Sequence, residues 1–191
     1  MADSNITKRA LAGALRELMN EMPFEKISVA DICQRCDMNR KSFYYHFKDK
    51  YDLVNWIFDT EFITLAMDEA MQLPYEDRFR FFETAGQYFY ENRDFYRKAL
   101  KIKGQNSFAD HFREYIQPIL RDRLTTIFGS ADADAFMLDF FTGAVVSAME
   151  SWLSSRDCIP PEELVAKMRR ILETGAVLVQ QEMEQTAKED G

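Results

Sequence analysis

The sequence is poor in the residues that interrupt helices. Glycine occurs seven times and proline five times in 191 residues. Val, Ile and Thr nowhere form the alternating pattern that is typical of a half-buried strand. Long stretches without a helix breaker predict helices, and the lack of strand patterns predicts an all-α fold.

Several signals of location and chemistry are also missing. No stretch reaches the ~18 apolar residues that a membrane span needs, and the N-terminus lacks the apolar segment of a secretory signal. We therefore expect a cytoplasmic protein that does not bind membranes. Three cysteines are too few for a disulfide framework. Cys33 and Cys36 form a C-x-x-C, but no second ligand pair accompanies it, so we expect buried thiols, no metal and no cofactor.

The sequence contains no nucleophile motif and no phosphate-binding glycine loop. We therefore predict no catalytic residue and no enzymatic activity. One alternative stays open, a small helical enzyme in which His111 works with an acidic neighbour. A lone histidine on a helix is more often structural.

Charge is distributed unevenly along the chain. Residues 1–50 contain nine Lys and Arg against seven Asp and Glu, which gives +2, whereas the remainder gives −10. A phosphate-binding surface needs a local cationic patch and not a cationic whole. Any contact with nucleic acid is therefore expected in the first quarter of the chain.

The spacing of apolar residues and breakers predicts about nine helices. We expect them at residues 5–21, 28–35, 40–47, 50–72, 75–91, 95–101, 108–128, 132–155 and 161–185. Ser28 and Asp31 fit a capping box, and Asn39 is a good N-cap for the third helix. Asp37 tolerates the left-handed backbone of a turn. Three short helices with such a turn between the second and third predict a helix-turn-helix unit.

The third predicted helix has an unusual composition, "RKSFYYHF" at residues 40–47. Phe43 and Phe47 are spaced i, i+4 and so lie on one face, which we expect to be buried. Arg40, Lys41 and Tyr45 belong to the rest of the surface. In a helix-turn-helix this helix enters the major groove, so the open face is expected to contact DNA.

The segment "ISVADICQRCDMNRKSFYYHFKDKYDLVNWIF" resembles the DNA-binding signature of TetR-family transcriptional regulators. The similarity covers about residues 6–60. Further on, "ENRDFYRKALKIKGQNSFADHF" resembles the regulatory domain of a subgroup that includes activators of dihydroxyacetone-kinase operons. Many members have Ala-Gly-Val in the turn and Gly at the third helix position. Here these are "CDM" and Lys41, which leaves the operator sequence unreadable.

The resemblance implies roles for the residues of this segment. Those expected to hold phosphates are Ser28, Tyr45, His46 and Lys50. Those expected to meet bases or neighbouring phosphates, together with the capping residue, are Asn39, Arg40, Lys41, Ser42 and Tyr44. The resemblance further implies a helix-turn-helix domain at residues 1–50 and a helical ligand-binding and dimerisation domain at residues 51–191.

Aromatic residues concentrate in the middle of the chain. Residues 75–115 hold twelve of the twenty-six Phe, Tyr and Trp, and no single helical face can bury all of them. One interpretation is an ordinary core. The other, which we adopt as a hypothesis, is a cavity for a small apolar effector. Its expected lining is Trp56, Met67, Phe82, Phe89, Tyr96 and Phe112.

The last two predicted helices carry apolar stripes that could pair with a second copy into a four-helix bundle. A monomer that buries both stripes internally is the alternative. The residues expected at the dimer interface are Leu138, Phe141, Val145, Ala148, Trp152, Leu164, Met168, Ile171, Leu172 and Val179. Two recognition helices related by symmetry would bind more tightly than one.

Taken together, the sequence predicts a homodimeric, ligand-responsive transcription factor that binds a near-palindromic double-stranded operator through residues 40–47. The effector is either a small molecule or a protein co-regulator. Two alternatives keep the fold without this function. One acts through a protein partner, and the other binds a ligand without binding DNA.

Overall fold

The computed structural model describes residues 2–64, 79–104, 106–128 and 134–189. Over these residues the chain forms nine α-helices, one short 3₁₀-helix, one π-helical segment and no strand. This confirms the predicted all-α class. The chain divides into two compact units, Met1–His111 and Phe112–Gly191.

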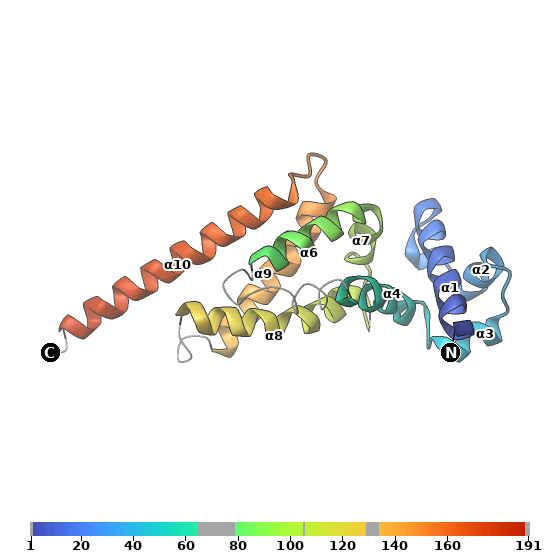
Figure 1. The fold of residues 1–191 in the computed structure, drawn as a ribbon, viewed down its shortest axis with the longest axis horizontal. Helices are drawn as coiled ribbons and strands as arrows, with labels where there is room; N and C mark the ends of the chain where they lie inside the picture. The colour runs from blue at the N-terminus through green and yellow to red at the C-terminus, as the bar shows by residue number, and fades with distance from the viewer. Residues whose placement is uncertain (1, 65–78, 105, 129–133, 190–191) are drawn as a thin grey trace. The chain divides into compact units, whose positions relative to one another are not determined.

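The first unit begins with a bundle of short helices (Figure 1). Its elements are α1 (Ala2–Glu21), η1 (Phe24–Lys26), α2 (Val29–Arg35), α3 (Arg40–His46) and α4 (Lys50–Phe58). Apolar side chains on α1 recur at helical spacing, and Leu11 and Leu15 are fully buried. They pack in a core with Ile32 of α2, Phe43 of α3 and Leu53 of α4, all of them fully buried as well. The predicted order of the first three helices is confirmed.

Ion pairs tie α2 to α1. The Arg35 guanidinium donates to both carboxylate oxygens of Glu21 at 2.7 Å and to Glu17 Oε2 at 3.2 Å. The hydrogen bond from Arg35 lowers the pKa of Glu21, and the same bond raises the pKa of Arg35. These groups are exposed, so their main effect is to fix the orientation of α2 and not to add much stability.

The helix after the third was expected to run without change to residue 72. Instead, α4 passes into a π-helical segment, η2 (Asp59–Ile63). Single turns of π-helix rotate the following side chains and frequently occur at functional sites. The predicted end at residue 72 lies outside the described residues, as does the predicted start of the next helix at residue 75.

Three further helices begin in the first unit: α6 (Phe79–Glu91), α7 (Arg93–Ala99) and α8 (Phe108–Phe128). The last has the predicted limits and continues through Pro118. Between α7 and α8 the chain turns at Gly104 and Asn106, which both have positive φ.

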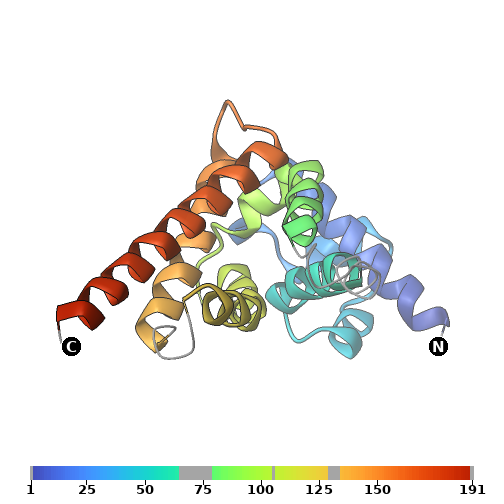
Figure 2. The same cartoon turned by 60° about the vertical axis from the view of Figure 1, so that its left-hand side comes forward.

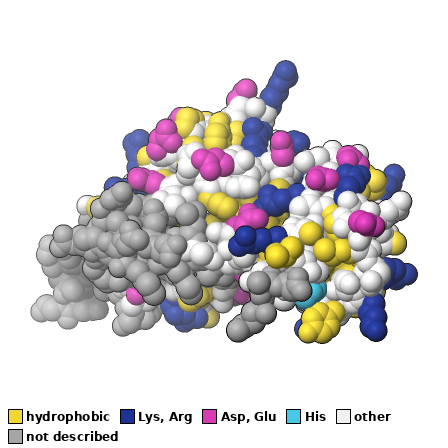
Figure 3. Space-filling model, turned by 45° about the vertical axis from the view of Figure 1, so that its right-hand side comes forward, with side chains coloured by type: hydrophobic (Ala, Val, Ile, Leu, Met, Phe, Trp, Pro, Cys, Tyr) yellow, Lys and Arg dark blue, Asp and Glu magenta, His cyan; other side chains and the backbone are white. Residues whose placement is uncertain are grey.

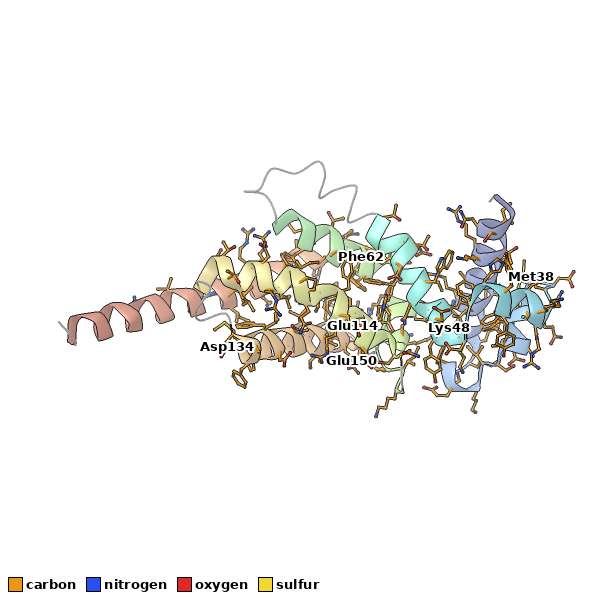
Figure 4. All side chains as sticks on the ribbon, turned by 90° about the horizontal axis from the view of Figure 1, so that it is seen from below. Met38, Lys48, Phe62, Glu114, Asp134 and Glu150 are labelled. Carbon is orange, nitrogen blue, oxygen red and sulfur yellow. The ribbon has the colours of Figure 1, made fainter. Side chains whose placement is uncertain are left out.

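An aromatic cluster forms the second core of this unit. It consists of Phe58, Phe62, Phe89, Tyr96 and Phe108, and all five side chains are buried. The Phe58 ring lies 4.9 Å from Phe62 and 5.4 Å from Phe108, measured between centroids. Tyr96 lies 4.8 Å from Phe89. The side-chain view shows Phe62 among these helices (Figure 4). The rings therefore pack directly on one another.

The second unit contains most of α8 with α9 (Ala135–Ser154) and α10 (Pro161–Glu189). Asp134 caps α9 by accepting the Met137 amide at 2.8 Å (Figure 4). Leu138 and Trp152 of α9 are buried. The C-terminal part of α10 extends beyond α8 and α9 (Figures 1, 2 and 4). Much of this long helix therefore has no covering within its own unit.

None of the described helices is long and apolar enough to cross a membrane. Over the same residues no group of three His, Cys, Asp or Glu is arranged to hold a metal ion. Cys33 is buried and Cys36 is half-buried. Burial raises the pKa of both thiols, which makes them poor nucleophiles.

Candidate nucleic-acid interface

The start of α3 is fixed by short-range hydrogen bonds. Asn39 Oδ1 accepts the Ser42 amide at 2.9 Å, which confirms the predicted N-cap. Asp37 adopts a φ of 55°, as the turn requires, and the Met38 amide donates to the Cys33 carbonyl at 2.8 Å. Hydrogen bonds therefore hold the turn at the end of α2 and at the start of α3.

The two faces of α3 differ sharply in burial. Phe43 is 0% exposed and Phe47, directly after the helix, is 3% exposed. On the other side Tyr44 is 52% and Tyr45 82% exposed, and Arg40 is exposed as well. Tyr44 and Tyr45 therefore present two neighbouring rings to solvent on this side of α3.

The exposed face combines cations with aromatic rings. Lys41 is exposed, and Ser42 and His46 are half-exposed. The Arg40 guanidinium lies 5.9 Å from the centre of the Tyr44 ring, and the Tyr45 and His46 rings meet edge to face at 4.9 Å. In the space-filling view, Lys and Arg side chains project from the part of the molecule that carries α1 to α3 (Figure 3). Cations and phenolic hydroxyls are the donors that bind phosphate oxygens.

Ser28 is used by the protein itself. Its hydroxyl donates to Asp31 Oδ2 at 2.7 Å and accepts the Asp31 amide at 3.2 Å. The Ser28 amide donates to the same carboxylate at 2.8 Å. This confirms the predicted capping box, and the hydrogen bonds from Ser28 lower the pKa of Asp31. Both Ser28 donors are occupied, so a phosphate would have to compete with the cap.

Lys50 is likewise turned into the protein. Its ammonium donates to the carbonyls of Phe24 and Ile27 at 2.7 Å and to that of Glu25 at 3.3 Å. It also lies 4.3 Å from the centre of the Phe24 ring. Burial lowers the pKa of Lys50. An ammonium has three protons, and here all three have acceptors. The predicted phosphate contact of Lys50 stays a prediction, but the geometry gives the residue a role inside the fold.

Trp56 was predicted to line an effector cavity. Its ring packs against Phe47, with centroids 5.6 Å apart, and its role in a cavity stays a prediction. The Lys8 ammonium lies above both rings, at 5.8 Å from the Phe47 centroid and 5.7 Å from the Trp56 centroid. The indole therefore supports the end of the recognition helix. Sequence reasoning missed Lys8, because its contact depends on how α1 meets α4.

The other residues predicted for an effector site are located as follows. Phe89 and Tyr96 meet in the aromatic cluster, and Phe82 is half-buried on α6. Phe112 is buried in the second unit, and Met67 lies outside the described residues. A surface pocket of ≈ 370 Å³ occurs elsewhere, at the end of α1. It is lined by Met19, Asn20, Glu21, Met22, Pro23, Phe24, Glu25 and Lys98.

The predicted dimer residues occupy different environments. Leu138 and Trp152 are 3% and 5% exposed, so they belong to the core of the second unit. Those that are half-buried are Phe141, Val145, Ala148, Leu164, Met168 and Leu172. Ile171 is 67% exposed, and the side chain of Val179 lies outside those described. The most exposed apolar side chains of α9 are ones that the sequence pattern did not single out, Phe136 at 78% and Phe140 at 61%.

A helix-turn-helix head with an aromatic and cationic recognition helix, followed by a larger helical region, defines the class of DNA-binding transcriptional regulators. Comparison with known families agrees. Residues 11–57 match the family described as bacterial regulatory proteins, tetR family. Residues 76–174 match the family described as transcriptional regulator C-terminal region. The chain belongs to the TetR family of transcriptional regulators. Proteins of this family are regulators and not enzymes, and ligand binding and homodimerisation are typical of them.

Individual relatives support the same conclusion. The chain is 31% identical over 102 residues to the HTH-type dhaKLM operon transcriptional activator DhaS of Lactococcus lactis subsp. lactis (strain IL1403). That match spans about half of each protein, 53% in both cases.

Two solved structures share the fold. The dihydroxyacetone kinase operon activator DhaS has a TM-score of 0.62 at 21% identity, over 91% of this chain and 97% of that one. A TetR transcriptional regulator from Streptococcus agalactiae 2603V has a TM-score of 0.63 at 21% identity, over 90% and 96%.

Proposed function

We propose that this regulator is a homodimer that binds a near-palindromic operator through α3, and that an effector bound among the helices that follow the helix-turn-helix changes its DNA affinity. The observation that carries the proposal is the division of α3 into a buried phenylalanine face and an exposed face with Arg40, Lys41, Tyr44 and Tyr45. Each subunit would present this face to one half-site, with half-sites ~34–36 Å apart.

Roles on this face follow from exposure and from the donors that remain available. Tyr45 and His46 would hold phosphates, and Arg40, Lys41 and Tyr44 would reach base edges or neighbouring phosphates. Ser42, in the first turn of α3, is half-exposed. Asn39, Ser28 and Lys50 would act mainly by fixing the position of α2 and α3, since their polar groups are engaged within the head.

The second copy would bind to the exposed face of α9. Phe136 and Phe140 are followed at helical spacing by the exposed small residues Ala144, Ser147 and Ser151. Large rings at one end and small side chains at the other allow a second helix to approach closely. Ile171 of α10, which is 67% exposed, adds apolar surface. This face differs from the predicted one because Leu138 and Trp152 point into the subunit.

Effector binding would act on the aromatic cluster. Phe89 and Tyr96 are fully packed by neighbouring rings, so a ligand there must displace at least one ring. Such displacement gives the ligand a preference for one conformation, which is what a coupled change in DNA affinity requires. Because the relative from Lactococcus lactis is named a dhaKLM operon transcriptional activator, an operon of this kind is the first target to test.

The test measures binding of the full chain to DNA duplexes from the region upstream of its own gene. Binding is monitored by fluorescence anisotropy at several salt concentrations. Specific binding that weakens with salt, with two chains per duplex, is expected. A protein that remains unbound to all duplexes at low salt would favour the alternative of a helical protein that acts without DNA. In a Trp152→Phe variant, Trp56 becomes the single fluorescent reporter of the head, because the sequence holds two tryptophans.

A further inference from the structure

Glu61 lies within the π-helical segment and is contacted from two different helices, α1 and α6. Arg16 of α1 donates to Glu61 Oε2 at 2.6 Å. The Tyr88 hydroxyl of α6 donates to the same oxygen at 3.0 Å. Tyr88 Oη in turn lies 2.7 Å from Tyr96 Oη of α7. One carboxylate oxygen therefore joins α1 of the DNA-binding head to α6 and, through Tyr88, to α7.

The direction of these hydrogen bonds follows from the number of protons. A phenol has one proton, and that of Tyr88 is directed at the carboxylate, which only accepts. Tyr96 must then donate to the Tyr88 oxygen. Burial raises the pKa of both phenols, so both keep their protons at neutral pH. The chain runs from Tyr96 through Tyr88 to Glu61, where it meets the guanidinium of Arg16.

The ends of this chain lie in contrasting environments. Tyr96 is 0% exposed in the centre of the aromatic cluster, whereas the Arg16 side chain is 25% exposed. Arg16 is further held by Asn92 Oδ1 at 3.3 Å and by the Phe95 ring, whose centre is 4.4 Å from its guanidinium carbon. The Arg16 side chain thus extends from α1 and contacts Asn92, between α6 and α7, and Phe95 of α7.

We propose that Tyr96, Tyr88, Glu61 and Arg16 form a relay that couples the aromatic cluster to the helix-turn-helix head, with Arg16 as its positioning residue. When a ring of the cluster moves, the hydrogen bond between the Tyr96 and Tyr88 hydroxyls breaks. Tyr88 and Glu61 then reorient, and Arg16 loses its ion pair with Glu61. The segment that carries Glu61 is π-helical, a form that frequently occurs at functional sites. The relay itself rests on these contacts, and its effect on transcription rests on the proposed function.

The test is amide hydrogen exchange of the free full-length chain, read by mass spectrometry. Tyr88→Phe removes only the relay hydroxyl, and it is expected to raise exchange in peptides of α1 around Arg16 by roughly two- to tenfold, the range for one hydrogen bond. Arg16→Gln is expected to raise exchange reciprocally around Tyr88 and Tyr96. Arg9→Gln, an exposed cation on the same helix, is the matched control and is expected to change neither.

Three results would overturn the relay. The first is that amide exchange in α1 is the same in Tyr88→Phe and in wild type. The second is that exchange rises in α9 as much as in α1, which would indicate loosening of the whole protein. Alternatively, Lys98→Met would reproduce the effect alone, through the bond of Lys98 Nζ to the Met19 carbonyl at 2.6 Å. A second arm measures the operator Kd. Tyr88→Phe should change the operator Kd when it is made in the wild-type chain. It should leave Kd unchanged when it is added to Arg16→Gln. Absence of any DNA binding would count against the proposed function and leave the exchange result to decide the relay.

Discussion

The ammonium of Lys50 lies 2.7 Å from the carbonyl oxygen of Ile27, although 23 residues separate them in the chain. Together with the bonds to Phe24 and Glu25, this contact fastens the 3₁₀ turn to the first turn of α4. The same turn leads directly into the capping box at Ser28. Lys50 therefore helps to set where α2 begins, and through α2 the position of α3.

Replacing Lys50 by Met is expected to destabilise the protein by about 1–3 kcal/mol, because the carbonyls lose a charged donor. Urea unfolding measures this change. The slope of log Kd against log salt should stay at the wild-type value.

Lys41→Gln, on the exposed face, should leave stability unchanged and lower that slope by about 1. A reduced slope in Lys50→Met with unchanged stability would instead assign Lys50 to a phosphate.

The Tyr45 hydroxyl is expected to contribute to DNA affinity and little to folding. Tyr45→Phe should weaken operator binding by roughly two- to tenfold, the range for one hydrogen bond. Because the ring is 82% exposed, the free energy of unfolding should change by less than about 0.5 kcal/mol. Anisotropy and urea unfolding measure the two quantities. Equal affinity of Tyr45→Phe and wild type would remove this hydroxyl from the interface.

Phe43→Ala provides the opposite case. Phe43 is fully buried, so its truncation should cost about 3–5 kcal/mol of stability. Any loss of DNA binding would then accompany loss of the folded head, visible as a lower Tm. If Phe43→Ala kept full stability, the buried face of α3 would have been assigned incorrectly.

The features that could be predicted from the sequence depend on residues close together in the chain. The caps by Asn39 and by Ser28 with Asp31 involve three intervening positions at most, and Phe43 with Phe47 needs only helical geometry. Each of these local predictions is confirmed. The order of helices followed for the same reason, since breakers are local.

The features that the sequence could not reveal depend on packing between distant segments. Arg16 and Glu61 are 45 residues apart, and no local pattern pairs them or predicts the π-helical segment at the end of α4. The interface face of α9 was ambiguous for a different reason. Apolar side chains lie on both sides of this helix, and the sequence pattern selected Leu138, which is buried, and not Phe136, which is exposed.

The dimer proposal predicts different effects at these two neighbours on α9. Phe136→Glu places a charge on an exposed position, so the subunit should keep its fold but dissociate, and sedimentation should show a monomer. Operator affinity should then fall by at least about tenfold, because the two heads no longer bind as one unit. Leu138→Glu should instead unfold the second unit, since it buries an unpaired charge. A dimer that survives Phe136→Glu combined with Phe140→Glu would show that another surface pairs the subunits.

The tyrosine pair predicts how stability responds to alkaline pH. Burial raises the pKa of Tyr88 and Tyr96 in the folded protein, whereas a tyrosine in the unfolded chain ionises near ~10. Above that pH the folded state binds more protons than the unfolded state, so stability is fully present below pH ~10 and falls as the pH rises further. The Tyr88→Phe, Tyr96→Phe double variant lacks both phenols. Its free energy of unfolding in urea should therefore decline less than that of wild type between pH ~9 and pH ~11. Tyr45→Phe serves as the matched control and should decline as wild type does. Parallel declines in the double variant and wild type would mean that these two hydroxyls are as accessible to ionisation in the folded protein as in the unfolded chain, which is incompatible with a buried relay.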